Sequence, residues 1–119
     1  MNTDTTNVET PGSDAHLPAD VVFDLLLDGR RRYALYYLSR KVGAVDVDEL
    51  VDRIAERDGT ETADHRDAIR LEFCHNHLRR LVDAGVLRYD RASETVERTA
   101  MARVFDPYLE LAFVQDLSR

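Results

Sequence analysis

The side chains best suited to recognising a nucleic acid lie between residues 70 and 80 of this 119-residue chain. Guanidinium, imidazole and amide groups read base edges and hold phosphates in a DNA major groove. The candidates for contact with bases share one side of a predicted helix and are Arg70, Phe73, His75, Asn76, Arg79 and Arg80. Arg88 and Arg91 follow this helix and are candidates for phosphate contacts. The pattern predicts a helix that enters the major groove of duplex DNA.

The helix that must position these groups is predicted to run from about His65 to Ala84. Its inward stripe, at the helical period, is Leu71, Cys74, Leu78, Leu81 and Val82. His77 is expected toward the edge of the outward side. Gly85 can take the positive φ that ends a helix, and the apolar alternation after it predicts a strand over residues 86–90. A recognition helix followed by a wing is the expected arrangement.

The rest of the chain supplies elements that support this helix. Residues 1–17 are polar, with almost nothing to bury, and predict a disordered tail. Asp46 and Glu49 have the spacing of a capping box, in which each side chain bonds the backbone near the other at the start of a helix. Further helices are expected over residues 20–28, 30–41 and 47–58, and a return strand over residues 94–99.

The fold class that follows is mainly α with a small antiparallel β wing: a winged helix-turn-helix over residues 18–100, with an added C-terminal helix over 101–119. Asp106 as N-cap and Pro107 in the first turn mark the start of that last helix. Its apolar face predicts a dimerisation element formed by Tyr108, Leu109, Ala112, Phe113 and Leu117. The alternative is that this helix folds back and completes the core of its own domain.

Charge is distributed unevenly along the chain. The net charge is −7, which taken alone argues against nucleic acid as a partner. Residues 66–91, however, hold six arginines against four acidic residues, whereas residues 20–64 hold seven basic residues against eleven acidic ones. The suspected contact region is therefore the basic part of an acidic chain. An ordinary solvated helix face that keeps arginine for salt tolerance is the alternative.

Three motifs carry a resemblance to known proteins. They are Arg30-Arg31-Arg32-Tyr33-x-Leu35-Tyr36-Tyr37-Leu38, Asp48-Glu49-Leu50, and His77-Leu78-x-x-Leu81-x-x-Ala84-Gly85-Val86-x-x-Tyr89-Asp90. Residues 22–99 resemble haloarchaeal winged helix-turn-helix domains of largely unassigned function, related in layout to transcription regulators of the ArsR and MarR type. The resemblance implies base-reading roles for the helix and phosphate roles for the wing. An acidic composition with one lysine and fifteen arginines is similar to that of proteins from salt-loving archaea.

Other functions find less support. The lone Cys74 cannot form an internal disulfide, which favours a reduced, cytoplasmic setting, and no apolar segment is long enough to span a membrane. Cys74 and His77 are three residues apart, a weak signal for a sensed metal, and a small buried thiol is the commoner role. The chain lacks a phosphate-binding glycine loop and a nucleophile elbow. We expect no enzymatic activity, no metal and no cofactor.

These observations predict a small archaeal transcription regulator that binds double-stranded DNA sequence-specifically as a homodimer. No small-molecule effector is readable from the sequence. The alternative is a winged-helix protein–protein interaction module that does not contact DNA, since a fold does not fix a function. Tyr33, Tyr36 and Tyr37, together with the C-terminal helix, would be the surfaces of such a module.

Overall fold

The computed structural model of the chain describes residues 17–59 and 62–114, so most of the predicted tail at residues 1–17 lies outside the described residues. The order of elements is α2 (Ala19–Leu27), α3 (Gly29–Ser39), β1 (Val45–Asp46), α4 (Val47–Arg57), α5 (Ala63–Glu72), the π-helical η2 (Phe73–Leu78), α6 (Arg79–Asp83), β2 (Leu87–Asp90), β3 (Thr95–Arg98), the 3-10 helix η3 (Ala100–Phe105) and α7 (Asp106–Ala112). The predicted fold class, mainly helical with a small antiparallel wing, is confirmed.

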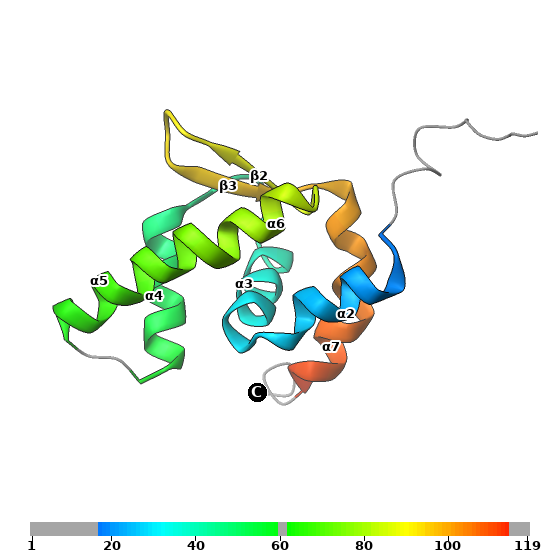
Figure 1. Cartoon of the computed structure of the whole chain (residues 1–119), viewed down its shortest axis with the longest axis horizontal. Coiled ribbons are helices and arrows are strands. Elements are labelled where there is room, and N and C mark those ends of the chain that lie inside the picture. The colour runs from blue at the N-terminus through cyan, green and yellow to red at the C-terminus, as the bar shows by residue number, and fades with distance from the viewer. Residues whose placement is uncertain (1–16, 60–61, 115–119) are drawn as a thin grey trace, which may run out of the picture.

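Three of these elements join end to end into the long helix expected from the sequence. α5, η2 and α6 follow one another without a break and run along one side of the molecule (Figure 1). Thr62 caps its start, because its side-chain oxygen accepts a hydrogen bond from the backbone of His65 at 3.2 Å. The helix therefore begins at Ala63, two residues before the predicted start.

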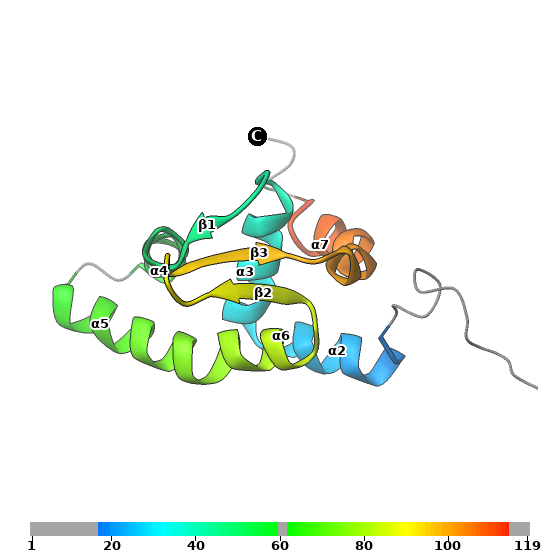
Figure 2. The same ribbon diagram turned by 90° about the horizontal axis from the view of Figure 1, so that it is seen from above.

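The sheet has the strand order β1-β3-β2, and both pairs of neighbours are antiparallel (Figure 2). Val96 on the central strand pairs with Val45 of β1 on one side and with Tyr89 of β2 on the other. β2 and β3 are the two strands predicted as the wing. The two-residue β1 was not predicted, because so short a strand shows no alternation of apolar and polar residues.

The core lies between α3 and the elements around it. Ala34, Leu35 and Leu38 of α3 are buried, and Phe73 of η2 and Phe105 of η3 are the largest fully buried side chains. Contacts from α3 reach α2, α4, η2, β3 and α7. The long helix is thereby held against the body of the protein along its inner side only, which leaves its outer side open.

The helix end predicted at Gly85 is confirmed, and Asp28 marks a second helix boundary. Gly85 has φ of +81°, and its N–H donates to the carbonyl of Val82 at 2.9 Å while Val86 donates to Leu81 at 3.0 Å. This pair of bonds is the Schellman motif that ends a helix at a glycine. Asp28 ends α2 and also caps α3, since its carboxylate accepts from the backbone N–H groups of Arg30 and Arg31.

Two predicted caps differ from the structure. The capping box is wrong: within the described residues the Asp46 side chain accepts no hydrogen bond from α4, and the Glu49 carboxylate accepts from the Tyr37 hydroxyl and pairs with Lys41 at 3.4 Å. Tyr37 on α3 and Lys41 just after it are therefore the partners of Glu49, in place of the backbone at the start of α4. Asp106 is likewise the first residue of α7 rather than its N-cap, and its carboxylate binds Arg98 through two bonds of 2.8 and 3.0 Å.

The C-terminal helix folds back onto its own domain. Leu109 and Phe113 are 1% and 5% exposed, and the Phe113 ring stacks on Tyr36 with centroids 4.4 Å apart. The predicted dimerisation roles of Leu109 and Phe113 are therefore wrong, because their apolar surface is already used inside the monomer. Tyr108 and Ala112 are exposed, and Leu117 lies outside the described residues. Within the part of the chain described here, no helix is long and apolar enough to cross a membrane.

Candidate nucleic-acid interface

The long helix buries most of the predicted stripe and departs from it near Leu71. Leu78 and Leu81 are buried and Cys74 and Val82 pack against the core, as predicted. Ile69 and Phe73 are at most 5% exposed, whereas Leu71 is 63% exposed. The π-helical η2 changes the angular step in the middle of the helix, so a constant period of 3.6 residues does not describe the whole segment. Leu71 as an inward residue and Phe73 as a DNA contact are both wrong, because Phe73 is enclosed by the core.

Arg70 also leaves the predicted contact face. Its guanidinium lies 2.6 Å from the Asp48 carboxylate of α4 and 3.6 Å from Glu94 in the turn of the wing. The side chain is therefore turned toward α4 and the wing turn, where it forms ion pairs with both carboxylates. Arg70 holds the long helix to its neighbours instead of facing a groove.

Toward the wing, the long helix presents a set of basic side chains. A groove between the helix and β2 is lined by Cys74, His75, Leu78, Arg79, Val82, Asp83, Tyr89 and Arg91. His75, Arg79 and Arg91 are exposed. Among the described residues, neither Arg79 nor Arg91 has a side-chain ion-pair or hydrogen-bond partner. Arg88 directly precedes Tyr89 on β2, so its side chain points to the opposite face of the strand, where Glu97 lies 4.0 Å away. We name the surface formed by His75, Arg79 and Arg91 in this groove the wing-side face.

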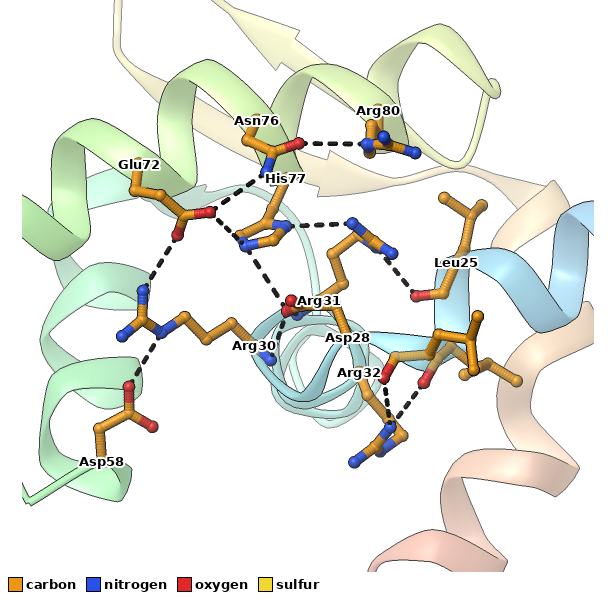
Figure 3. A network of polar contacts seen from close by, with 12 residues as sticks. Leu25, Asp28, Arg30, Arg31, Arg32, Asp58, Glu72, Asn76, His77 and Arg80 are labelled. Atoms are coloured by element: carbon orange, nitrogen blue, oxygen red, sulfur yellow. Dashed lines mark hydrogen bonds and ion pairs between the residues drawn. The ribbon is translucent and has the colours of Figure 1, made fainter.

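On its other side, toward α2, the helix carries a connected row of polar groups (Figure 3). Asn76 donates from Nδ2 to Glu72 at 3.2 Å, and its Oδ1 accepts from Nε of Arg80 at 3.1 Å. Arg80 in turn lies 3.5 Å from Asp24 of α2. Asn76 and Arg80 are both exposed, as predicted, but each already has partners within the protein.

The row continues inward to a buried histidine. His77 was expected at the edge of the outward side, yet it is 2% exposed. Its Nε2 lies 2.9 Å from Glu72 and 3.5 Å from Asp28, while Nδ1 faces the Arg31 guanidinium at 3.2 Å (Figure 3). Burial is the main cause that lowers the pKa of His77 below 6.5. Arg30 completes the network by bonding both Glu72 and Asp58.

With this geometry in place, comparison with known families assigns the chain. The model of a family described as Domain of unknown function (DUF7344) matches residues 23–97, which is more than half of the 119 residues. The chain belongs to the DUF7344 family. No curated protein matches, and no solved structure matches. The DUF7344 match contains every residue of the wing-side face and of the polar row, and it leaves α7 outside.

Cys74 of this DUF7344 domain shows no sign of metal chemistry. Burial is the main cause that raises the pKa of its thiol above 9.0, which disfavours the thiolate that a metal needs. His77 is committed to Glu72 and Arg31. In residues 17–59 and 62–114, no group of three or more His, Cys, Asp or Glu side chains could hold a metal ion.

Most of the DUF7344 polar network was not predicted from the sequence: Asp28, Arg30, Arg31, Asp58 and Glu72 as its members, and the buried position of His77. One signal was available, because Glu72, Asn76 and Arg80 are spaced four residues apart and therefore form one row along a helix. The link to Arg31 had no such signal. It spans 46 positions in sequence and depends on how α3 packs against η2.

Proposed function

We propose that this DUF7344 domain binds double-stranded DNA sequence-specifically and acts as a small transcription regulator. The observation that carries the proposal is the wing-side face, where His75, Arg79 and Arg91 line one groove formed by the long helix and the wing. An α-helix fits the major groove, and a wing beside it can reach the adjoining backbone. The exposed outer side of the long helix is compatible with that docking.

The ion pairs separate two kinds of arginine in this domain. Arg79 and Arg91 have no carboxylate partner among the described residues, so binding a phosphate or a guanine costs them no existing ion pair. Arg70 and Arg80 are paired with acidic side chains and would have to exchange partners. We therefore assign the main electrostatic contacts to Arg79 and Arg91. Arg88, which would have to leave Glu97, is assigned a further phosphate contact, and Asn76 and Arg80 are assigned contacts with bases.

Two further parts belong to the proposal. A haloarchaeal, cytoplasmic origin, supported by the acidic and lysine-poor composition, makes the net charge of −7 compatible with DNA binding. At about 1 M salt the Debye length is roughly 3 Å, so charges away from the contact hardly act on the DNA. A homodimer would place two wing-side faces about 34 Å apart for successive turns of one duplex. Leu109 and Phe113 are excluded from its interface by their burial.

A selection experiment tests the function. A duplex library of random sequence is incubated with the protein in roughly 2 M KCl, where nonspecific binding is suppressed, and the retained fragments are sequenced. We expect a shared motif for wild type and its loss in the Arg79→Ala/Arg91→Ala variant. Arg103→Ala is the matched control, because Arg103 on η3 is also exposed and has no partner among the described residues. Equal retention by all three proteins, or no enrichment by wild type, contradicts the proposal.

One observation favours the second candidate, an interaction module. Among the described residues, nine large hydrophobic side chains are exposed. Five of them belong to α2, η3 and α7 and a sixth follows α7: Phe23, Leu27, Val104, Tyr108, Leu111 and Val114. The tyrosine surface suggested by the sequence is less suitable, because Tyr36 is stacked on Phe113 inside the monomer. This candidate predicts that Leu27→Glu/Leu111→Glu abolishes association while Arg79→Ala/Arg91→Ala does not.

A further inference from the structure

The polar row on the α2 side of the long helix fixes the orientation of one amide group. Glu72 is a carboxylate and only accepts, so the Asn76 atom that faces it at 3.2 Å must be the nitrogen. Arg80 only donates, so the Asn76 atom that faces its Nε at 3.1 Å must be the oxygen. Two partners with opposite requirements thus allow one of the two amide orientations.

Glu72 is itself held from the interior of the protein. Its Oε1 accepts from Nη1 of Arg30 at 3.0 Å, and its Oε2 lies 2.9 Å from Nε2 of His77 (Figure 3). His77 must present a proton at Nε2, because Nδ1 accepts from the Arg31 guanidinium. The carboxylate that orients Asn76 is therefore anchored by α3 and by a buried ring of η2, although it lies at the surface.

The oriented amide keeps free hydrogen-bonding capacity toward solvent. One N–H of Nδ2 and one lone pair of Oδ1 are not used by Glu72 or Arg80. A side-chain amide that offers a donor and an acceptor together matches N7 and the N6 amino group of adenine in the major groove. A rotated amide, with donor and acceptor exchanged, would present the opposite pattern.

From this geometry we propose that Asn76 selects adenine at one position of the bound duplex, and that Glu72 is the positioning residue that holds the Asn76 amide in the orientation required for adenine. The inference rests on the proposed function and deepens it, because it names a base and the residue that sets the choice. Arg80 is the second positioning residue, through the bond from its Nε to Asn76.

The test compares base preference with overall affinity, since a merely structural role would change both together. Wild type should lose on the order of tenfold to a hundredfold in affinity when the selected adenine is replaced. Glu72→Gln keeps the shape of the side chain but lets it donate as well as accept, so only Arg80 still requires one orientation of the Asn76 amide. We expect the adenine preference to fall by at least about threefold from the wild-type value, with affinity for random duplex unchanged or higher.

Asp67→Asn is the matched control. Asp67 lies on the same long helix but outside the groove and the polar row, is exposed, and makes no side-chain hydrogen bond among the described residues, so this change removes the same charge without touching Asn76. It should keep the adenine preference. Asn76→Ala, an exposed change that does not threaten the fold, should lose the preference completely.

Each outcome has one meaning. Wild type that selects no sequence contradicts the proposed function itself. Selective binding with the same adenine preference in Glu72→Gln as in Asp67→Asn overturns the positioning role, and selective binding unchanged in Asn76→Ala overturns the adenine contact. Both outcomes leave the proposed function standing. A measurement without DNA uses the NMR signals of the Asn76 side-chain amide, which should shift in Glu72→Gln and stay in place in Asp67→Asn.

Discussion

The guanidinium of Arg31 lies 3.2 Å from Nδ1 of His77, and both side chains are buried, at 7% and 2% exposure. Apart from His77, Arg31 donates to the carbonyl oxygens of Leu25 at 3.1 Å and Asp24 at 3.0 Å. A guanidinium only donates, so Nδ1 of His77 carries no proton. The ring is therefore neutral in the folded protein, with its proton on Nε2 facing Glu72.

Acidification should destabilise the fold through His77. Burial is the largest cause that lowers its pKa, the positive charges of Arg31 and Arg30 act in the same direction, and Asp28 and Glu72 oppose them. The unfolded chain binds a proton near pH 6.5, whereas the folded protein resists protonation until a lower pH. The contribution of His77 is complete above pH 6.5 and is lost as the pH falls through the folded pKa.

Urea unfolding from pH 8 to pH 5 measures this effect. The free energy of unfolding should fall by at most about 1.4 kcal/mol per pH unit for one such group. His77→Gln should flatten the dependence in this window, because glutamine does not titrate. His75→Gln, at an exposed histidine, should leave it as in wild type. A flat profile in wild type would show that His77 is not kept neutral by the fold.

Removing the buried cation should both destabilise the protein and raise the pKa of His77. Arg31→Met leaves the carbonyls of Leu25 and Asp24 and Nδ1 of His77 without their donor, and each buried acceptor without a partner costs about 1–3 kcal/mol. The pKa of His77 should rise because one of the causes that lowers it is gone. Proton NMR titration of the ring and thermal unfolding report the two effects separately, and an unchanged ring titration would contradict the assigned contact.

Signals from residues close together in the sequence predicted the helices and strands. The candidate site depends instead on contacts between residues that are far apart in the sequence. The helix end at Gly85 and the wing strands depend on residues close together in the sequence, so both were predicted correctly. The inward stripe was predicted correctly from Cys74 to Val82 and wrongly at Leu71, because the π-helical segment and the packing of Phe73 against the core are not visible in a fixed helical period. The burial of His77 was missed for the same kind of reason, since Arg31 is brought to it only by the folding of α3 against η2.

The turn between the long helix and the wing should depend strongly on Gly85. Its φ of +81° is left-handed, a conformation that costs other residues about 1–2 kcal/mol, and an added Cβ would lie 3.3 Å from the sulfur of Met101. Gly43 has the same φ but nothing within 4 Å of such a Cβ. Gly85→Ala should therefore lower the unfolding free energy more than Gly43→Ala does. Equal losses in chemical denaturation would mean that the contact with Met101 adds nothing beyond backbone strain.

The packing of α7 on its own domain makes a prediction that separates core from surface. Phe113→Ala removes a ring that stacks on Tyr36 at 4.4 Å and lies 4.7 Å from the Arg57 guanidinium, and a buried phenylalanine of this kind contributes about 3–5 kcal/mol. Leu111→Ala changes a side chain that is 75% exposed and should alter the unfolding free energy by less than about 0.5 kcal/mol.

If α7 also carries a subunit contact, Leu111→Ala should lower the association constant, measured by light scattering over a range of concentrations. Phe113→Ala should lower the melting temperature, even that of the dilute monomer. A Phe113→Ala protein with the melting temperature of wild type would show that the ring does not complete the core, and the apolar face of α7 would again be open for a partner.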